Sequence, residues 1–136
     1  MRRDQRGTAA LEFCLVAVPF FTLMFAIFDL GRYAITVQSL RMLANAGARS
    51  VMIYPTCVTA ALQKQSLIGC APSDLLSITP NVPPALYWGG LTPTLGPSTT
   101  STNPLTVTAS LPAFTMIMPI WGTSLNAPSA TTAIPF

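Results

Sequence analysis

Apolar residues are concentrated in one uninterrupted run near the start of the chain. From Thr8 to Phe28 the sequence reads T-A-A-L-E-F-C-L-V-A-V-P-F-F-T-L-M-F-A-I-F, and Glu12 is its one charged residue. At 1.5 Å per residue a helix of this length is roughly 31 Å long, close to the thickness of the hydrocarbon core of a bilayer. The pattern predicts a transmembrane helix over residues 8–28.

A basic leader, residues 1–7, precedes this run and contains Arg2, Arg3 and Arg6. It is compatible with a cleavable secretory signal or with a permanent membrane segment. The apolar run is long for a signal, and the nearest small-x-small site after it, at residues 44–46, lies far beyond the usual cleavage point. We therefore favour a retained segment, with the arginines holding the N-terminus in the cytoplasm and the chain from about residue 29 onward outside.

Two residues inside the apolar run are unusual for a membrane segment. Glu12 places a carboxylate where an ionised group normally needs a partner; it either lies at headgroup depth, near Arg6, or has a function. Pro19 has no N–H to donate, so the carbonyl of Leu15 is left free. A kink or a locally melted turn is expected there.

Beyond the membrane, the spacing of apolar residues predicts that the helix continues as an exported amphipathic helix over residues 29–54. Pro55 ends the pattern, which gives nearly continuous helix from about 9 to 53. One apolar stripe packs either against neighbouring subunits or against this chain's own C-terminal domain, the usual role of an amphipathic face. The apolar stripe comprises Leu30, Tyr33, Val37, Leu40, Ala44, Ala48 and Val51, and a polar stripe comprises Gln38, Arg41, Asn45 and Arg49.

The remainder, residues 55–136, is predicted to be a small domain with short strands. A helix is possible at 59–66, and Cys57 and Cys70 are expected to form a disulfide if this part is exported. Leu75–Thr79 and the alternating segment Leu105–Leu111 are predicted strands. Turns are expected at 83–84 and 88–90, an exposed mobile loop at 92–103, and a last edge strand within 125–134. The segment 114–121 either continues a strand or rests on the membrane or the long helix.

The pattern therefore predicts an α+β fold, in which a long N-terminal helix packs against a small antiparallel sheet. Charged residues make up only 8% of the chain, the formal net charge is +3, and there is no histidine. The basic residues are not interleaved with aromatic residues as in a nucleic-acid interface, so no nucleic-acid partner is expected. Asp29 and Asp74 cannot build a metal cage and are interpreted as solvated or capping residues. We expect no enzyme activity, cofactor or metal, because a nucleophile with a nearby base is not evident.

A family resemblance rests on the residues around the start of the apolar run. Gly7-Thr8-Ala9-Ala10-Leu11-Glu12, preceded by basic residues and followed by an apolar run, is the recognition pattern of type IV prepilin-like substrates. Together with Pro19, Asp29-Leu30-Gly31-Arg32 and the closing Gly47-Ala48-Arg49, the stretch resembles the TadE-like pseudopilins of the tight-adherence (Tad, type IVb) pilus. The resemblance covers roughly residues 6–49.

The resemblance implies a role in pilus assembly. A prepilin peptidase would cut after Gly7, and Thr8 would become the new N-terminus. Glu12 would then support processing or assembly by meeting the amino terminus of a neighbouring subunit. The protein would lie in the bacterial inner membrane with its C-terminus in the periplasm, and its partners would be the peptidase, other pilins, the Tad assembly platform and membrane lipid. Some relatives are thought to stay uncut, which leaves as the alternative an uncleaved single-pass membrane protein whose periplasmic domain binds secretion-machinery or envelope partners.

Overall fold

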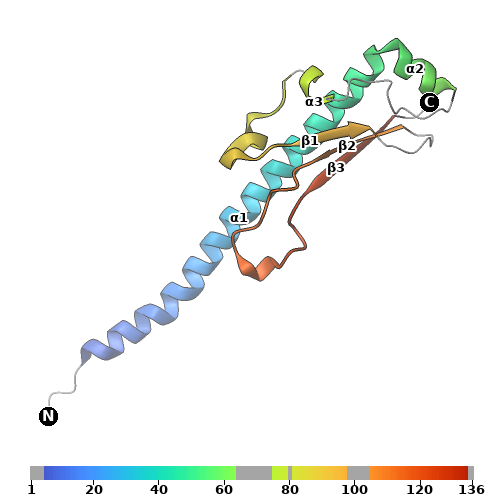
Figure 1. The fold of residues 1–136 in the computed structure, drawn as a ribbon. Helices are drawn as coiled ribbons and strands as arrows, with labels where there is room; N and C mark the ends of the chain where they lie inside the picture. Colours follow the sequence, from blue (N-terminus) through green and yellow to red (C-terminus); the bar gives the residue numbers. More distant parts are fainter. Residues whose placement is uncertain (1–4, 64–74, 80, 98–104, 135–136) are drawn as a thin grey trace.

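The computed structural model describes residues 5–63, 75–79, 81–97 and 105–134, and its longest element is the helix α1 (Gln5–Ile53). At 1.5 Å per residue, its 49 residues span roughly 74 Å. Figure 1 shows the N-terminal part of α1 standing clear of the rest of the chain, while its C-terminal part carries the sheet and the short helices. The predicted helix ends where expected, just before Pro55, but begins earlier, at Gln5.

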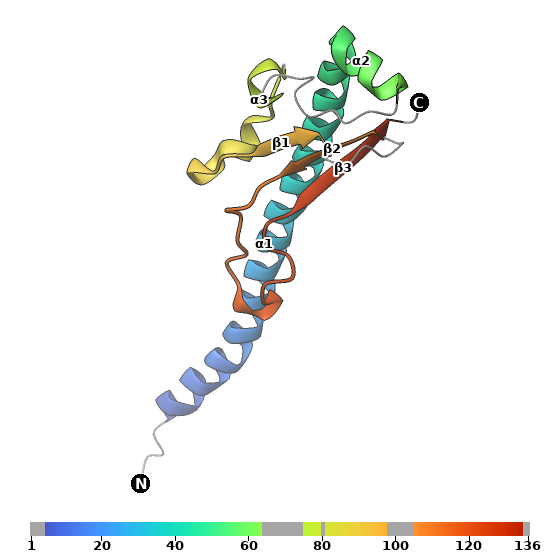
Figure 2. The same ribbon diagram turned by 45° about the vertical axis from the view of Figure 1, so that its right-hand side comes forward.

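α1 continues through Pro19 without a break, so the predicted melted turn is absent. The hydroxyl of Thr22 donates to the carbonyl of Val18 at 2.7 Å, one turn back along the helix. Figure 2 shows the blue N-terminal part of α1 inclined to the remainder of the helix. A bend without a break is the usual response of a helix to an internal proline.

A three-stranded antiparallel sheet, in the order β1-β2-β3, lies against the C-terminal part of α1. Its strands are β1 (Thr94–Pro97), β2 (Leu105–Ser110) and β3 (Ser129–Ile134). β2 is the central strand. Its Ser110 pairs with Thr94 of β1, and its Thr108 pairs with Thr131 of β3. The predicted strand over 105–111 and the final edge strand are confirmed, and β3 begins directly after Pro128 because proline donates no ladder hydrogen bond.

The two faces of the sheet differ in polarity, as the alternation of residues in β2 predicts. Val107 and Ala109 are fully buried. On the opposite, solvent-exposed face the hydroxyls of Thr108 and Thr131 lie 3.3 Å apart, and those of Thr94 and Ser110 lie 2.7 Å apart. Such cross-strand pairs fix the register of a sheet that has only one apolar face.

The apolar stripe of α1 packs against the chain's own C-terminal part, as the more usual interpretation predicted. Leu40, Ala44, Ala48 and Val51 are buried, whereas Leu30 at the start of the stripe is 40% exposed. Two clusters form this core. The first comprises Leu40, Leu43, Ala44, Leu86, Ala109, Leu111, Phe114 and Ala130, and the second comprises Ala48, Val51, Cys57, Leu75 and Val107. The polar stripe, Gln38, Arg41, Asn45 and Arg49, is exposed.

Two expectations for the middle of the chain are wrong. The predicted strand at Leu75–Thr79 is the one-turn helix α3 (Leu75–Ile78), in which the Thr79 hydroxyl donates to the Leu75 carbonyl at 2.8 Å and Leu75 is buried. The predicted loop at 92–103 contains β1, although residues 98–104 lie outside the described part. Leu95, the one large apolar residue of this strand, packs on both core clusters and holds the strand against α1.

Short helices flank the sheet near the predicted helix and turns. α2 (Pro55–Leu62) begins four residues before the helix expected at 59–66, with its proline at the first position, where a missing N–H costs nothing. η1 (Pro84–Gly90) buries Leu86 and ends where a turn was expected. Gly89 and Gly90 have φ values of +73° and +75°, which glycine adopts without strain.

The segment Phe114–Trp121 does not continue β2. Pro112 follows β2 closely, and the segment forms a loop that ends in η2 (Pro119–Trp121). Phe114 is buried, with its ring centroid 6.4 Å from that of Tyr33 on α1. The loop is closed on itself, because the Ala127 N–H donates to the Phe114 carbonyl at 3.0 Å and the Asn126 side chain accepts from the Met116 N–H at 2.9 Å. The expectation that this segment rests on the long helix is confirmed.

The close approach of β1 to α1 yields a stability prediction. A Cβ atom at Gly47 would lie 2.7 Å from Leu95 Cδ2, whereas a Cβ at the exposed Gly31 meets nothing within 4 Å. Gly31→Ala should therefore raise the free energy of unfolding by up to about 1 kcal/mol through helix propensity. Gly47→Val should lower it by about 1–3 kcal/mol through overpacking. Urea unfolding of the full chain in detergent micelles, followed by tryptophan fluorescence, measures both.

Leu95→Ala provides the control for this pair. If the clash causes the loss at Gly47, the double variant Gly47→Val/Leu95→Ala should be more stable than the sum of the two single changes predicts. Strict additivity would show that Leu95 is not the group that Gly47 accommodates.

Candidate functional site

The N-terminal part of α1 up to Phe28 has no protein covering its apolar side chains. α1 contains a candidate membrane span between Gly7 and Ile53, and none of the residues in its most apolar 18-residue stretch is buried. A core helix of a soluble protein would bury most of such a stretch. Its exposed large apolar residues are Leu11, Phe13, Leu15, Val16, Val18, Phe20, Phe21, Leu23, Phe25, Ile27 and Phe28. Because they point in all directions around the helix, this surface suits a lipid environment.

The residues predicted to direct processing and assembly lie in the first turns of α1. Gly7, Thr8 and Glu12 are exposed, and a Cβ added at Gly7 would meet nothing within 4 Å. Thr8 and Glu12 are four residues apart, so both lie on the same face of the helix. The backbone of Arg6 belongs to α1, whereas Arg2 and Arg3 lie outside the described residues. Gly7, Thr8 and Glu12 therefore lie on the accessible surface of the chain.

One half of the predicted disulfide lies within the described part of the chain. Cys57, in α2, is buried and disulfide-bonded, while Cys14, in the apolar part of α1, is a free thiol. Cys70 lies outside the described residues, so its pairing with Cys57 stays a prediction.

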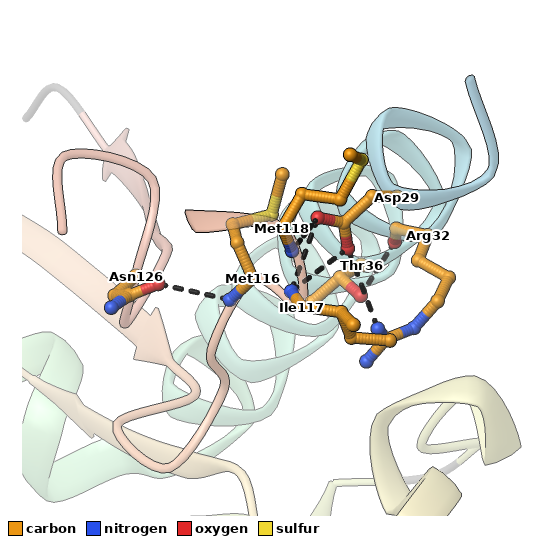
Figure 3. A network of polar contacts seen from close by, with 7 residues as sticks. All are labelled: Asp29, Arg32, Thr36, Met116, Ile117, Met118 and Asn126. Atoms are coloured by element: carbon orange, nitrogen blue, oxygen red, sulfur yellow. Dashed lines mark hydrogen bonds and ion pairs between the residues drawn. The ribbon is translucent and has the colours of Figure 1, made fainter. Parts of the chain in front are cut away.

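A carboxylate at the end of the apolar run forms the main polar contact between α1 and the C-terminal part. Asp29 directly follows Phe28 and is only 2% exposed. Its Oδ1 and Oδ2 accept hydrogen bonds from the Ile117 N–H at 3.2 and 3.1 Å, and its Oδ2 accepts one from the Met118 N–H at 3.0 Å (Figure 3). We call this group, Asp29 with the N–H groups of Ile117 and Met118, the Asp29 clamp.

Arg32, one turn along α1, adds a weaker electrostatic contact. Its Nη1 lies 3.5 Å from Asp29 Oδ1, and its Cζ lies 5.4 Å from the centroid of the Phe114 ring. Since the Arg32 side chain is 39% exposed and the ion pair is long, the pair contributes little free energy. The two backbone N–H groups are the main partners of the buried charge, because hydrogen bonds to an ionised acceptor are stronger than neutral ones. Thr36 turns back to its own helix and donates to the Arg32 carbonyl at 2.9 Å.

The interpretation of Asp29 as a solvated or capping residue is wrong. The residue is buried, and its partners lie 88 and 89 positions further along the chain. One signal in the sequence pointed to it: an ionisable residue next to a membrane-length apolar run usually has a specific partner. The identity of that partner was not readable from the sequence. Among the described residues, no three His, Cys, Asp or Glu side chains gather as a metal site.

Comparison with known protein families matches residues 7–49 to the family described as TadE-like protein. The match includes Gly7, Glu12, Asp29 and Arg32 and ends within the packed part of α1. No curated protein and no solved structure matches the chain. The N-terminal third of the chain is thus TadE-like, which confirms the resemblance, and the sheet and the loop 114–127 lie outside the matched region.

The Asp29 clamp predicts a local effect of substitution. Asp29→Ala leaves two N–H groups near α1 without an acceptor and should lower the free energy of unfolding by about 2–4 kcal/mol. Arg32→Ala should cost under about 1 kcal/mol. Hydrogen–deuterium exchange of the full chain in micelles should show much faster exchange at the amides of Ile117 and Met118 in Asp29→Ala, with the amides of β2 as the internal reference. Unchanged exchange at these two amides would contradict the clamp.

Proposed function

We propose that this protein is a non-enzymatic subunit or assembly component of a Tad-type (type IVb) pilus, held in the inner membrane by α1 with its sheet domain in the periplasm. The observation that carries the proposal is the coincidence of three features in one helix: a TadE-like sequence at 7–49, an apolar part without any protein cover, and a packed part that holds a small sheet. The basic leader supports a cytoplasmic N-terminus.

The first turn of α1 is compatible with cleavage by a prepilin peptidase after Gly7. α1 begins at Gln5, so the Gly7–Thr8 peptide bond lies in the first turn of the helix, where the first N–H groups have no intrahelical acceptor. Glycine further lowers the cost of unwinding this turn. A protease could therefore unwind the helical Gly7–Thr8 segment at low cost and without disturbing the sheet domain.

Glu12 supplies the contact that draws the subunit into an assembly. In hydrocarbon an isolated carboxylate is costly, and the amine created at Thr8 of a neighbouring subunit would be a matching cation. Thr8 and Glu12 share one face of α1, so two parallel copies displaced by about one helical turn would bring the amine of one to the carboxylate of the other. Processing and assembly would then depend on one local surface.

The alternative is an uncut single-pass membrane protein whose periplasmic domain binds secretion or envelope partners. The helical start of α1 at Gln5 favours it, because the Gly7–Thr8 bond is not extended in the uncut chain. The mass of the membrane-extracted protein separates the two functions. Loss of Met1–Gly7 supports the pilus subunit, and an intact N-terminus supports the alternative.

Gly7→Ala should block processing without affecting the fold. The added methyl group meets nothing within 4 Å, so insertion and domain stability should stay at the wild-type level. Gly31→Ala is the matched control, since Gly31 is equally open and lies far from the cleavage point. Mass spectrometry of the protein from cells that contain the peptidase checks this. Normal removal of Met1–Gly7 in Gly7→Ala would rule out the proposed cleavage.

Glu12→Gln should leave the protein in the membrane and reduce its incorporation into pili by at least tenfold, because a neutral amide cannot pair with the amine of a neighbour. Glu12→Asp keeps the charge and should be intermediate. Quantifying the subunit in sheared filaments and in membranes measures the effect. Wild-type incorporation of Glu12→Gln would contradict the pairing role.

A further inference from the structure

The loop held by the Asp29 clamp exposes large apolar side chains close to the end of the apolar run. Ile117 is 74% exposed and Ile120 is 58% exposed, although their neighbours Phe114 and Met118 turn inward or bind α1 through the backbone. Trp121, in η2, is half-buried, and its indole Nε1 is buried without a hydrogen-bond partner among the described residues. We call Ile117, Ile120 and Trp121 the loop tip.

The Asp29 clamp fixes the level of the loop tip along α1. Asp29 follows the last residue of the membrane-length run, and its hydrogen bonds place the backbone of Ile117 and Met118 at that level. Figures 1 and 2 both show η2 as the segment of the C-terminal part closest to the exposed end of α1. If residues 8–28 fill the hydrocarbon core, the loop tip lies at its boundary.

A second aromatic residue lies slightly further out. Trp88, in η1, is 75% exposed and lines a small cavity with Arg32, Ile35 and Thr36 of α1. These positions are one to two turns beyond Asp29, or roughly 5–10 Å along the helix. This is the depth of the headgroup region, where tryptophan is enriched in membrane proteins. Both tryptophans of the chain therefore lie within two turns of the end of the apolar run.

The composition and the hydrogen bonds of the loop also suit this position. The sequence from residue 75 to the end contains no Asp, Glu, Lys or Arg, so no side-chain charge would have to enter the interface. The N–H groups of Ile117 and Met118, which lie nearest to the boundary, are already paired with Asp29. Backbone groups in the hydrocarbon region must have partners within the protein, so this pairing is compatible with a position at its boundary.

We propose that the loop tip inserts into the periplasm-facing boundary of the same bilayer that α1 spans, with Trp88 at headgroup depth. The inference rests on the proposed membrane anchoring of α1. A lipid surface is the occupant that the observations favour, because the loop tip continues the uncovered apolar surface of α1 at the level where that surface meets the headgroups. The sheet domain is thereby seated on the membrane and cannot rotate freely above it.

The two tryptophans provide a direct test in the full chain. Trp88→Phe leaves Trp121 as the only tryptophan, and Trp121→Phe leaves Trp88; neither change removes a hydrogen bond that the described residues make. Each variant is reconstituted in phosphatidylcholine vesicles whose acyl chains carry bromine either near the headgroup or near the methyl end. We expect Trp121 emission to be strongly quenched by bromine near the headgroup and less by bromine near the methyl end. Trp88 should be quenched more weakly than Trp121 by both lipids.

Two further variants connect the quenching to the loop. Ile117→Ser/Ile120→Ser changes only exposed side chains and should reduce the quenching of Trp121 while the fold is kept. Asp29→Ala releases the loop from α1 and should also reduce the quenching of Trp121. Gln38→Ser, on the exposed polar stripe, is the control and should leave the quenching unchanged.

Flotation of the protein with the vesicles separates this inference from the proposed function. A chain that floats with the vesicles and shows no difference between brominated and ordinary lipid at Trp121 overturns the inference alone. If brominated lipid does not quench Trp121 and the Trp121 emission instead changes with protein concentration, the loop tip binds a second copy of the chain. This result would also overturn the inference. A chain that does not float overturns both the membrane anchor and the inference.

Discussion

One buried carboxylate joins the two parts of this molecule at the point where the surface of α1 changes character. Before Asp29 the helix is uncovered and apolar on all sides, and after it the helix buries a stripe under the sheet. The loop that Asp29 binds connects β2 to β3, so the same contact fixes the position of the sheet along the helix. A free aspartate at this place would have to be solvated. Pairing it with two N–H groups removes that need and holds the loop against α1 at this boundary.

The elements that could be predicted are those whose signal is periodic within their own sequence. α1, its buried stripe and β2 follow from repeats of three to four residues and of two residues, which report the burial of one face. α3 and β1 could not be predicted in this way. Leu75 and Leu76 of α3 and Leu95 of β1 lie in short segments, and they pack on core clusters built from distant parts of the chain. Four-residue elements carry too few positions for a period to be recognised.

The residues of the candidate site likewise fall into those with a local sequence signal and those that depend on distant contacts. Gly7, Thr8 and Glu12 form a local motif, so the sequence identifies them and their exposure in α1 is consistent with that interpretation. Asp29 acts through backbone N–H groups of Ile117 and Met118, which carry no side-chain signature. A hydrogen bond between a side chain and a distant backbone can be found only when the fold is known, because any residue except proline supplies the same N–H.

The packing of α1 also limits how this protein can join an assembly. Leu40, Ala44 and Val51 are covered by the chain's own sheet and short helices, so neighbouring subunits cannot use them without unfolding the domain. The surfaces of α1 that stay exposed include the apolar part before Asp29 and the polar stripe that contains Arg41 and Arg49. The first is compatible with lipid and with other apolar helices, whereas the second is suited to water. Contacts made within the membrane therefore have to begin at the uncovered apolar part, and a sheet domain seated on the bilayer limits the rotations of α1 from which they can form.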